Sequence, residues 1–488
     1  METNTLSAIR QQLEQLESNM LAESGKRILG LPNLHAEQIR AAKNLVHYMV
    51  LRNQDLRNLQ DLLHINGLSS LASSESHVHR QLQAIMERLG KHYDPHELSS
   101  CTYEASHRWI ETKSCHLFGS EQKCEVPAIM VTFDTSFANN YALIKNLLQN
   151  GMNVARINCA HDDETTWAKM INKLKKACYH TKLDCKIYMD LAGPKLRTLL
   201  LNKGKEKGKV KVEEGQIIWL AYHNNSFEKD DVVISPGEPG ILETLQKGER
   251  VYIDDGVIRT QVEKVKKDRI GIRITRISSE KKQIKADKGI NFPDSQLNMP
   301  PLTEFDRRCL PFICEHAHLV GYSFVKTAAD VAYLRTLLNA QTPQPPNIII
   351  KIETPESVVN LPDLLLEGMQ QPFFGVMIAR GDLAVEIGFE RMSEVQEEIL
   401  WICEAAHVPV IWATQVLDNL NKSGIATRSE ITDATHAALA ECIMINKGEH
   451  TIEVIETLRD ILHRTAAHRI KKRYTFRPLS IATKFLEA

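Results

Sequence analysis

Hydrophobic positions recur along this chain with spacings that differ from one stretch to the next, and each spacing predicts a type of element. Within residues 1–92 apolar side chains return every three or four residues, for example at Leu6, Ile9, Leu13, Leu16 and Met20. This spacing predicts amphipathic helices, and Gly67 and Gly90 stand where helices are expected to end. The first helix holds only about three heptads, so we favour packing on its own domain over a coiled coil.

The pattern changes near residue 125, where short apolar runs begin to alternate with helical stretches. The runs 128–132, 153–156 and 187–190 are typical of strands, and helices are expected at 141–150 and 167–180 between them. This βαβαβ order predicts a parallel sheet. Residues 93–124 show a weaker apolar period, interrupted by Pro95 and Gly119, and are predicted to form a linker.

A second change falls between residues 203 and 287, where short strand-like runs are separated by turn residues and predict an all-β insert. The alternation resumes at about 288, with strands expected at 319–324, 348–353, 376–382, 408–414 and 442–445. Strands before and after the insert sum to about eight, which is the number of a closed parallel barrel. The predicted fold is α/β, a (β/α)8 TIM barrel with an inserted β domain and a helical extension. Its units are 1–92, 93–124, 125–202, 203–287, 288–465 and a basic tail at 466–488.

Composition excludes several classes of partner. The net charge is −1, with 43% hydrophobic and 25% charged residues. Nucleic acid or an anionic membrane normally requires a basic excess, so neither is expected as the main partner. The chain begins without a basic and then apolar segment, and no apolar run approaches the roughly 20 residues that cross a bilayer, so a cytoplasmic protein is expected. The ten scattered cysteines include no C-x-x-C pair, which indicates reduced core thiols.

Two of the predicted strands end in charged residues. The run 348–353 carries Lys351 and Glu353 at its end, and the run 375–383 carries Asp382 as its second-last residue. In a parallel α/β sheet, residues just past the carboxyl ends of strands face one shared crevice. Two carboxylates there can hold a hard divalent cation, and a nearby ammonium can meet a phosphoryl group. These three residues therefore predict one site for phosphate chemistry.

The sequences at several predicted strand ends resemble those of a known protein family. They read MNVARINCAH at 152–161, MDLAGPKLRT at 189–198, YIDDG at 252–256, KGINFP at 288–293, IKIE at 350–353, MIARGDL at 377–383 and ATQ at 413–415. In order and spacing they resemble pyruvate kinase over about residues 125–460. The helical start, with NQDLR at 53–57 and GLSSL at 67–71, resembles the extension of some bacterial pyruvate kinase-like proteins.

The resemblance implies a role for each matching residue. Glu353 and Asp382 would bind Mg²⁺ or Mn²⁺, and Lys351 would stabilise the transferring phosphoryl group. Arg156 and Arg197 would contact phosphates, for which the forked guanidinium is suited. Amides of Gly381 and Asp382 at a helix start would bind the substrate carboxylate, and Thr414 would lie beside the carbon that is protonated. The resemblance places His161 and Lys288, together with Arg197, on the nucleotide side.

Departures from the family pattern lie around the predicted monovalent-cation site. Many members carry a glutamate after Gly-Pro and two hydroxyl residues nearby, and use K⁺. This chain has Lys195, Ala160 and Leu191 instead, while Asn158 and Asp190 are kept. A lysine ammonium can replace the charge of the cation, so we predict that K⁺ is not required.

Other departures concern the nucleotide and regulation. The turn TFDTS at 132–136 lacks the family's Gly-Pro, so Phe133 and Asp134 leave the nucleotide preference open, and NKGEH at 446–450 replaces Ser-Gly-Glu-Thr. The family's carboxy-terminal α/β domain would need over 100 further residues. We therefore expect no activation by sugar phosphates bound in that domain, and clear activation by fructose bisphosphate would contradict this. The basic run RIKKR at 469–473 favours a solvated tail over an anion site.

The leading hypothesis is an enzyme, a phosphotransferase that converts phosphoenolpyruvate and ADP to pyruvate and ATP. Two alternatives stay open: a metal-dependent lyase acting on oxo acids, and a non-catalytic regulatory binding protein. The phosphate-binding arginines argue against the first alternative, and retention of Lys351, Glu353, Asp382 and Thr414 argues against the second. We expect a homo-oligomer, with the helical extension as a candidate contact surface.

Overall fold

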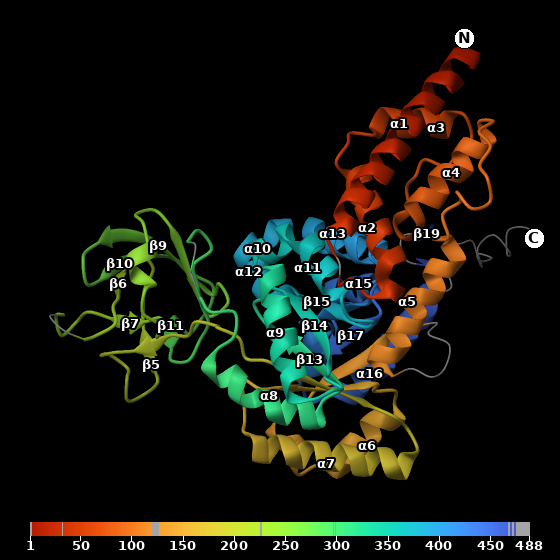
Figure 1. The fold of residues 1–488 in the computed structure, drawn as a ribbon. Helices are drawn as coiled ribbons and strands as arrows, with labels where there is room; N and C mark the ends of the chain where they lie inside the picture. Colours follow the sequence, from red (N-terminus) through yellow and green to blue (C-terminus); the bar gives the residue numbers. More distant parts are fainter. Residues whose placement is uncertain are drawn as a thin grey trace, which may run out of the picture.

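The computed structural model describes residues 2–31, 33–119, 126–224, 227–295, 297, 299–466, 469–470 and 473–474. Figure 1 shows three parts: a helical unit formed by the start of the chain, a central barrel wrapped by helices, and a β domain at the opposite side of the barrel. The helical unit and the β domain lie at different sides of the barrel.

The centre is a closed barrel of parallel strands in the order β1-β17-β16-β15-β14-β13-β3-β2. This confirms the predicted TIM barrel. The strands are β1 (Ala128–Thr132), β2 (Val154–Asn158), β3 (Lys186–Asp190), β13 (Leu319–Tyr322), β14 (Asn347–Ile352), β15 (Gly375–Ala379), β16 (Val410–Ala413) and β17 (Cys442–Ile445).

Successive residues of each strand alternate between the barrel interior and the surrounding helices. In β14, Ile348, Ile350 and Ile352 pack in the core beneath the helices, whereas Ile349 packs in the interior cluster. Because the side-chain period of a strand is two, Lys351 and Glu353 continue the interior row of Ile349. The same alternation carries Asp190 inward two residues after Tyr188, which also belongs to the interior cluster.

The helices around the barrel begin close to the strand ends. They are α6 (Tyr141–Gln149), α7 (Glu164–Thr181), α8 (Glu304–His316), α9 (Ala328–Gln341), α10 (Pro355–Val359), α11 (Leu361–Gly368), α12 (Arg380–Ile387), α13 (Met392–Ala405), α14 (Asp418–Ser423), α15 (Arg428–Ala437) and α16 (Thr451–Ala466). Thr354 caps α10 by accepting from the Ser357 N–H, with Pro355 in the first turn. This cap fixes the backbone immediately after Glu353.

The β domain contains a seven-stranded sheet in the order β12-β8-β9-β10-β6-β7-β4, with β5 and β11 paired beside it. Its strands are β4 (Leu199–Leu200), β5 (Lys209–Lys211), β6 (Ile217–Leu220), β7 (Val233–Ser235), β8 (Arg250–Ile253), β9 (Ile258–Val265), β10 (Ile270–Ile277), β11 (Gln283–Lys285) and β12 (Ile290–Asn291). A separate aliphatic core, including Ile218, Val251 and Ile272, holds this domain together. The sheet begins before residue 203 and ends after 287, because its two edge strands are the connections to the barrel.

The amino-terminal unit contains α1 (Glu2–Leu29), α2 (Ile39–Arg52), α3 (Arg57–Ile65), α4 (Val78–Arg88) and α5 (Tyr103–Phe118). Helix α5 falls within the predicted linker, so that part of the prediction needs correction. Thr102 caps its start and Gly119 ends it at φ 76°. Its inward face includes the polar residues Ser106, Lys113 and Ser114, which interrupt the apolar period that would have revealed the helix.

The helical unit covers the amino-terminal end of the barrel. Leu117 and Phe118 at the end of α5 belong to the interior cluster of the barrel. The Asn44 amide donates to the Ala405 carbonyl at 2.8 Å, and the Lys113 ammonium donates to the His407 carbonyl at 2.9 Å. Burial of the Lys113 ammonium lowers its pKa to about 7. With this end closed, the opposite mouth of the barrel is left for chemistry.

After α16 the structure describes two short strands, β18 (Arg469–Ile470) and β19 (Arg473–Tyr474), which pair antiparallel. The other residues of the predicted basic tail lie outside the described part of the chain. Among the described residues, none of the helices combines the length and apolar character needed to span a membrane. The cysteines in the described part are free thiols, and Cys159 is buried in the core beneath the helices.

Candidate active site at the carboxyl ends of the barrel strands

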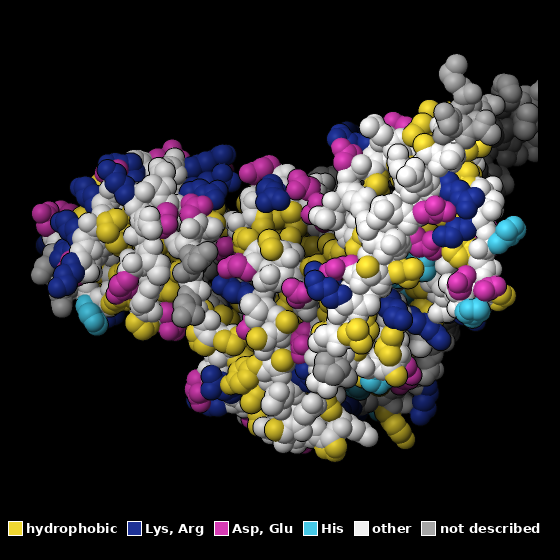
Figure 2. All heavy atoms as spheres, turned by 45° about the horizontal axis from the view of Figure 1, so that its top comes forward, with side chains coloured by type: hydrophobic (Ala, Val, Ile, Leu, Met, Phe, Trp, Pro, Cys, Tyr) yellow, Lys and Arg dark blue, Asp and Glu magenta, His cyan; other side chains and the backbone are white. Residues whose placement is uncertain are grey.

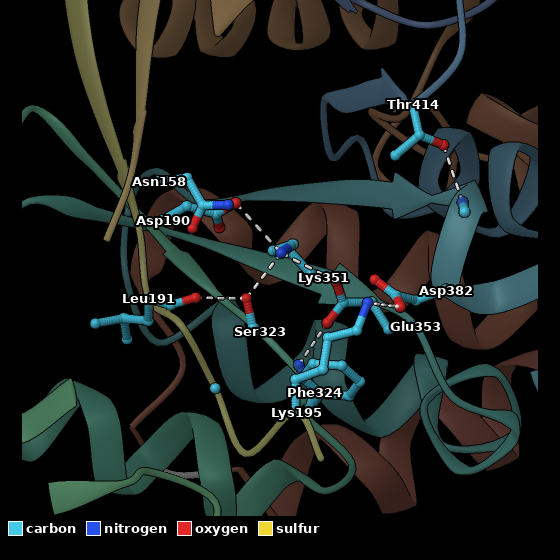
Figure 3. A network of polar contacts seen from close by, with 12 residues as sticks. Asn158, Asp190, Leu191, Lys195, Ser323, Phe324, Lys351, Glu353, Asp382 and Thr414 are labelled. Carbon is cyan, nitrogen blue, oxygen red and sulfur yellow. Dashed lines mark hydrogen bonds and ion pairs between the residues drawn. The ribbon is translucent and has the colours of Figure 1, made fainter. Parts of the chain in front are cut away.

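Charged side chains from several strands meet at the carboxyl end of the barrel. Figure 3 shows Asp190 from β3, Lys351 from β14, Glu353 just past β14 and Asp382 from α12 grouped together, with Ser323 beside them. Lys351, Glu353, Asp190 and Ser323 are each buried. Burial of several ions is costly unless each one is paired, so the pairing pattern defines the site.

The Lys351 ammonium lies at the centre of this group. It donates to Ser323 Oγ at 2.7 Å, and it pairs with Glu353 Oε1 at 2.9 Å and Asp190 Oδ2 at 3.3 Å. Burial alone would lower the pKa of Lys351, but the negative charges of Asp190 and Glu353 outweigh it and raise the pKa. Lys351 is therefore a fixed positive charge within the barrel mouth.

Arg156 reaches the same carboxylate from β2. Its Nε and a terminal nitrogen both donate to Asp190 Oδ2, at 3.1 and 2.5 Å, and its other terminal nitrogen donates to Thr132 Oγ1 at 3.1 Å. Burial raises the pKa of Asp190, but Lys351 and Arg156 outweigh that effect and lower it. Asp190 thus stays ionised and holds both cations in place.

Glu353 lies beside Lys351 with its second oxygen on the backbone. The Phe324 N–H donates to Glu353 Oε2 at 2.7 Å. Burial raises the pKa of Glu353, Lys351 opposes this, and the negative charge of Asp382 adds to it, with a net rise. The rise comes mainly from burial, and the negative charge of Asp382 adds a smaller contribution.

Asp382 is held by a cation from a different part of the chain. The Lys195 ammonium donates to Asp382 Oδ1 at 2.5 Å and lies 3.6 Å from Asp255 Oδ1 in the β domain. Asp382 belongs to the first turn of α12, so its position follows directly from the end of β15. The carboxylate is 22% exposed, which leaves it accessible from the mouth of the barrel.

The residues fit a hard divalent cation. Glu353 and Asp382 supply carboxylate oxygens, the ligands that Mg²⁺ and Mn²⁺ prefer. Their mutual repulsion is relieved here by the ammonium groups of Lys351 and Lys195. A cation of charge two bound between them would relieve the same repulsion.

Thr414 has an unusual backbone. Its φ is +66° and that of Gln415 is +57°, a region that β-branched residues rarely adopt. Arg380 holds this turn by donating to the Thr414 carbonyl at 2.6 Å while it pairs with Asp433. The Gly381 N–H donates to Thr414 Oγ1 at 2.9 Å, so the amide predicted to bind a substrate carboxylate is occupied by Thr414 in this structure.

The predicted nucleotide residues lie on two parts of the molecule. Arg197 donates to the Asp287 carbonyl at 3.1 Å and Lys288 pairs with Asp254 at 3.0 Å, both at the base of the β domain. His161 is exposed at the barrel mouth. Partial desolvation of the ring is the main cause that lowers the pKa of His161, and the charges of Lys447 and Arg197 add to it.

A cavity of about 550 Å³ lies beside His161, and its lining includes Thr132, Phe133, Asp134, Arg156 and Lys447. Asp134 Oδ1 accepts from the N–H and the hydroxyl of Ser136, at 2.9 and 2.5 Å. The carboxylate therefore caps the short helix Thr135–Ala138. Asp134 thus has a structural role in the altered turn.

At the predicted monovalent-cation site, the residues that pair with Asp190 differ from the expectation. Asp190 Oδ2 is shared by Arg156 and Lys351, and Oδ1 accepts from the Tyr188 hydroxyl at 3.2 Å. Asn158 Oδ1 accepts from the Ala160 N–H at 3.0 Å. Lys195, predicted to replace K⁺ beside Asp190, instead contacts Asp382 and Asp255. The charge that neutralises Asp190 comes from Arg156 and Lys351.

Two residues of the site were not singled out from the sequence. Ser323 accepts from Lys351 and donates to the Leu191 carbonyl at 2.7 Å. Lys447 lines the cavity beside His161. Their positions in the sequence could have identified both residues, because Ser323 directly follows β13 and Lys447 closely follows β17. Side chains at the carboxyl ends of barrel strands face the active site.

Comparison with known proteins agrees with this geometry. A family profile described as the barrel domain of pyruvate kinase matches residues 127–452. The chain belongs to the pyruvate kinase family. Pyruvate kinase of Geobacillus stearothermophilus is 32% identical over 328 residues, covering 65% of this chain and 53% of that protein. Pyruvate kinase of Bacillus licheniformis is 30% identical over 334 residues, covering 66% and 54%.

The fold agrees as well. A crystal structure of a pyruvate kinase from Cryptosporidium parvum matches with a TM-score of 0.62 and 27% identity, covering 70% of this chain and 69% of that one. This chain spans about half the length of the curated relatives it matches. The profile match begins at residue 127, so helices α1 to α5 lie outside it.

Proposed function

We propose that this pyruvate kinase family member is an active pyruvate kinase. It transfers the phosphoryl group of phosphoenolpyruvate to ADP and gives pyruvate and ATP. The observation that carries the proposal is the ion-paired set of Arg156 with the buried Lys351, Asp190 and Glu353 at the carboxyl end of the barrel. Phosphoryl transfer between two anions depends on fixed cations and positioning, and this set supplies both.

Residues of this chain would act on the substrate as follows. Lys351 and Arg156 would bind the phosphate of phosphoenolpyruvate, because both cations are fixed before substrate arrives. As the bond between phosphorus and the enol oxygen breaks and a bond to the terminal phosphate oxygen of ADP forms, Lys351 would neutralise charge on the transferring group. A divalent cation held by Glu353 and Asp382 would supply a Lewis acid for the substrate oxygens.

Thr414 would act at the last step, in which the enolate of pyruvate takes a proton at its methylene carbon. Its Oγ1 accepts from the Gly381 N–H, which leaves the hydroxyl hydrogen to donate toward the substrate side. Thr414 and Gln415 both have left-handed backbone conformations directly after β16. Backbone strain of this kind is typical of functional positions.

The decisive experiment measures pyruvate formation in a coupled assay with Mg²⁺, ADP and phosphoenolpyruvate. We expect Lys351→Met to lose at least about a thousandfold in kcat, since the main fixed charge on the phosphoryl group is removed. Lys326→Met serves as a matched control because Lys326 pairs with Glu356 outside this group, and it should keep near wild-type activity. Equal background rates in the wild type and Lys351→Met would reject catalysis.

We also propose that the enzyme needs no K⁺. Ala160 and Leu191 have no side-chain oxygen, and the oxygens of Asp190 and Asn158 already accept hydrogen bonds. Few oxygens are left for a monovalent cation. The assay at constant ionic strength, with KCl exchanged for tetramethylammonium chloride, should give the same rate. A severalfold increase with KCl would reject this part of the proposal.

Nucleotide selectivity and assembly stay predictions. His161, Arg197 and Lys288 would contact the nucleotide, and the turn at Phe133 and Asp134 borders the cavity beside His161. Replacing ADP with GDP or UDP in the coupled assay measures how far this turn selects the base. Sedimentation of the full chain measures the expected homo-oligomer.

A further inference from the structure

Lys195 contacts two parts of the molecule, the barrel and the β domain. Its ammonium lies 2.5 Å from Asp382 Oδ1 on the barrel and 3.6 Å from Asp255 Oδ1 on the β domain. Figure 3 shows the end of Lys195 beside the carboxylates of Glu353 and Asp382. The ammonium therefore stands at the oxygens that the proposed divalent cation would use.

One carboxylate oxygen cannot serve both cations. Mg²⁺ binds oxygen at roughly 2.0–2.1 Å and requires near-octahedral surroundings. A second positive charge at hydrogen-bond distance from the same oxygen repels the metal in a partly buried site, where screening by water is weak. A metal that binds through Asp382 Oδ1 thus requires the ammonium of Lys195 to leave that oxygen.

Asp255 offers the Lys195 ammonium an alternative partner. The Asp255 carboxylate is 64% exposed and Lys195 is already within ion-pair distance of it. Gly289 permits this close approach of Lys195 to Asp255, because an added Cβ there would lie 3.0 Å from Lys195 Cε and 3.3 Å from Asp255 Oδ1. A small shift moves the ammonium from the barrel carboxylate to the β-domain carboxylate.

We propose that Lys195 is a displaceable internal counter-ion that competes with the divalent cation for Asp382 and transfers to Asp255 when the cation binds. This rests on the proposed function in one respect, the assignment of Glu353 and Asp382 to the cation. Lys195 then lowers the affinity for the cation and couples its binding to the position of the β domain. The same contact places a positive charge on Asp382, beside the carboxylate of Glu353.

The test measures Mn²⁺ binding to the full chain without substrate, by the electron paramagnetic resonance signal of free Mn²⁺. We expect Lys195→Met to bind Mn²⁺ at least about tenfold more tightly than the wild type, equivalent to ~1.4 kcal/mol. Lys326→Met removes a comparable charge near the same mouth without touching Asp382, and it should change the affinity less than about twofold. Unchanged or weaker binding by Lys195→Met would overturn the proposal.

A second variant tests the transfer to the β domain. Asp255→Asn removes the alternative partner, so Lys195 should stay on Asp382 and Mn²⁺ binding should weaken by about threefold. Tighter binding by Asp255→Asn would overturn the coupling. If Lys195→Met does not fold, Lys195→Gln keeps most of the length without the charge and takes its place, with the same tenfold expectation.

The outcomes separate this inference from the proposed function. Tighter Mn²⁺ binding by Lys195→Met, together with no pyruvate formation by the wild type, would support the counter-ion and reject the kinase. Pyruvate formation by the wild type, without a change in Mn²⁺ affinity in Lys195→Met, would support the kinase and reject the counter-ion. No Mn²⁺ binding by either protein would reject the counter-ion and the metal assignment together. Asp382→Asn confirms the site by abolishing the tight binding in the Lys195→Met background.

Discussion

Replacing Asp190 by asparagine should destabilise the barrel strongly. The carboxylate is fully buried and accepts two hydrogen bonds from Arg156 and one each from Lys351 and Tyr188. In Asp190→Asn the side chain keeps its shape, but two buried cations lose their shared counter-charge. Breaking a buried ion pair by removing one partner typically costs about 3–5 kcal/mol.

The size of the effect follows from the whole network. A typical protein is stable by only about 5–15 kcal/mol, so this loss is a large fraction of the total. Part of the loss should return when one cation is also removed. In the double variant Asp190→Asn with Lys351→Met, only Arg156 lacks its carboxylate, and the coupling energy should be about 1–3 kcal/mol in the favourable direction.

Urea unfolding of the four proteins of this cycle, followed by circular dichroism, measures the coupling. A loss under about 1 kcal/mol for Asp190→Asn would refute the reasoning, because it would mean that water or a rearranged cation replaces the carboxylate at little cost. Additive effects in the double variant would refute it equally, since they would show that Lys351 does not depend on Asp190.

Other predictions concern the site and the helical unit. Ser323→Ala should lower kcat about tenfold with little change in KM, because it removes an acceptor 2.7 Å from the Lys351 ammonium; an unchanged kcat would contradict this. Thr414→Val should reduce kcat more than Thr414→Ser, since only serine keeps the hydroxyl that accepts from Gly381, and steady-state kinetics decides. Burial, then His79, lowers the pKa of His47 to about 3. Its folded pKa lies below the unfolded value, so the associated stability is present above pH 6.5 and is lost as the pH falls, by about 2 kcal/mol at pH 5; His47→Gln should flatten the thermal stability measured between pH 7 and 5, and an equally steep decline in that variant would oppose the assignment.

Much of the barrel could be predicted from local pattern. Continuous apolar runs such as Ile348–Ile350 are typical of strands buried on both faces, and their alternation with amphipathic helices predicts parallel order. The charges after these runs predicted that Lys351, Glu353 and Asp382 would meet, and the structure brings them together. These features depend on residues close in sequence, which is why pattern was sufficient.

The hydrophobic pattern and residue spacing of the sequence did not predict helix α5 or the position of Lys195. Helix α5 turns polar residues inward because Lys113 finds acceptors on Gln38 and His407, and those partners are distant in sequence. Lys195 was expected beside Asp190, yet it contacts Asp382 and Asp255. Choice among several carboxylates depends on distances across the barrel mouth, which spacing along the chain does not encode.

The sequence by itself determined the order of the elements, the barrel and the identity of the charged strand ends, because side-chain period and strand termination are local properties of the backbone. Only the tertiary structure decided which charges pair. Asp190 holds Arg156 and Lys351, while Lys195 holds Asp382. Coulomb energy depends on separation and burial, and both arise only when eight strands close into a barrel and the β domain is attached beside it. Figure 2 shows charged side chains of both signs on the surface of the β domain. Their positions in the sequence do not say which of them form ion pairs.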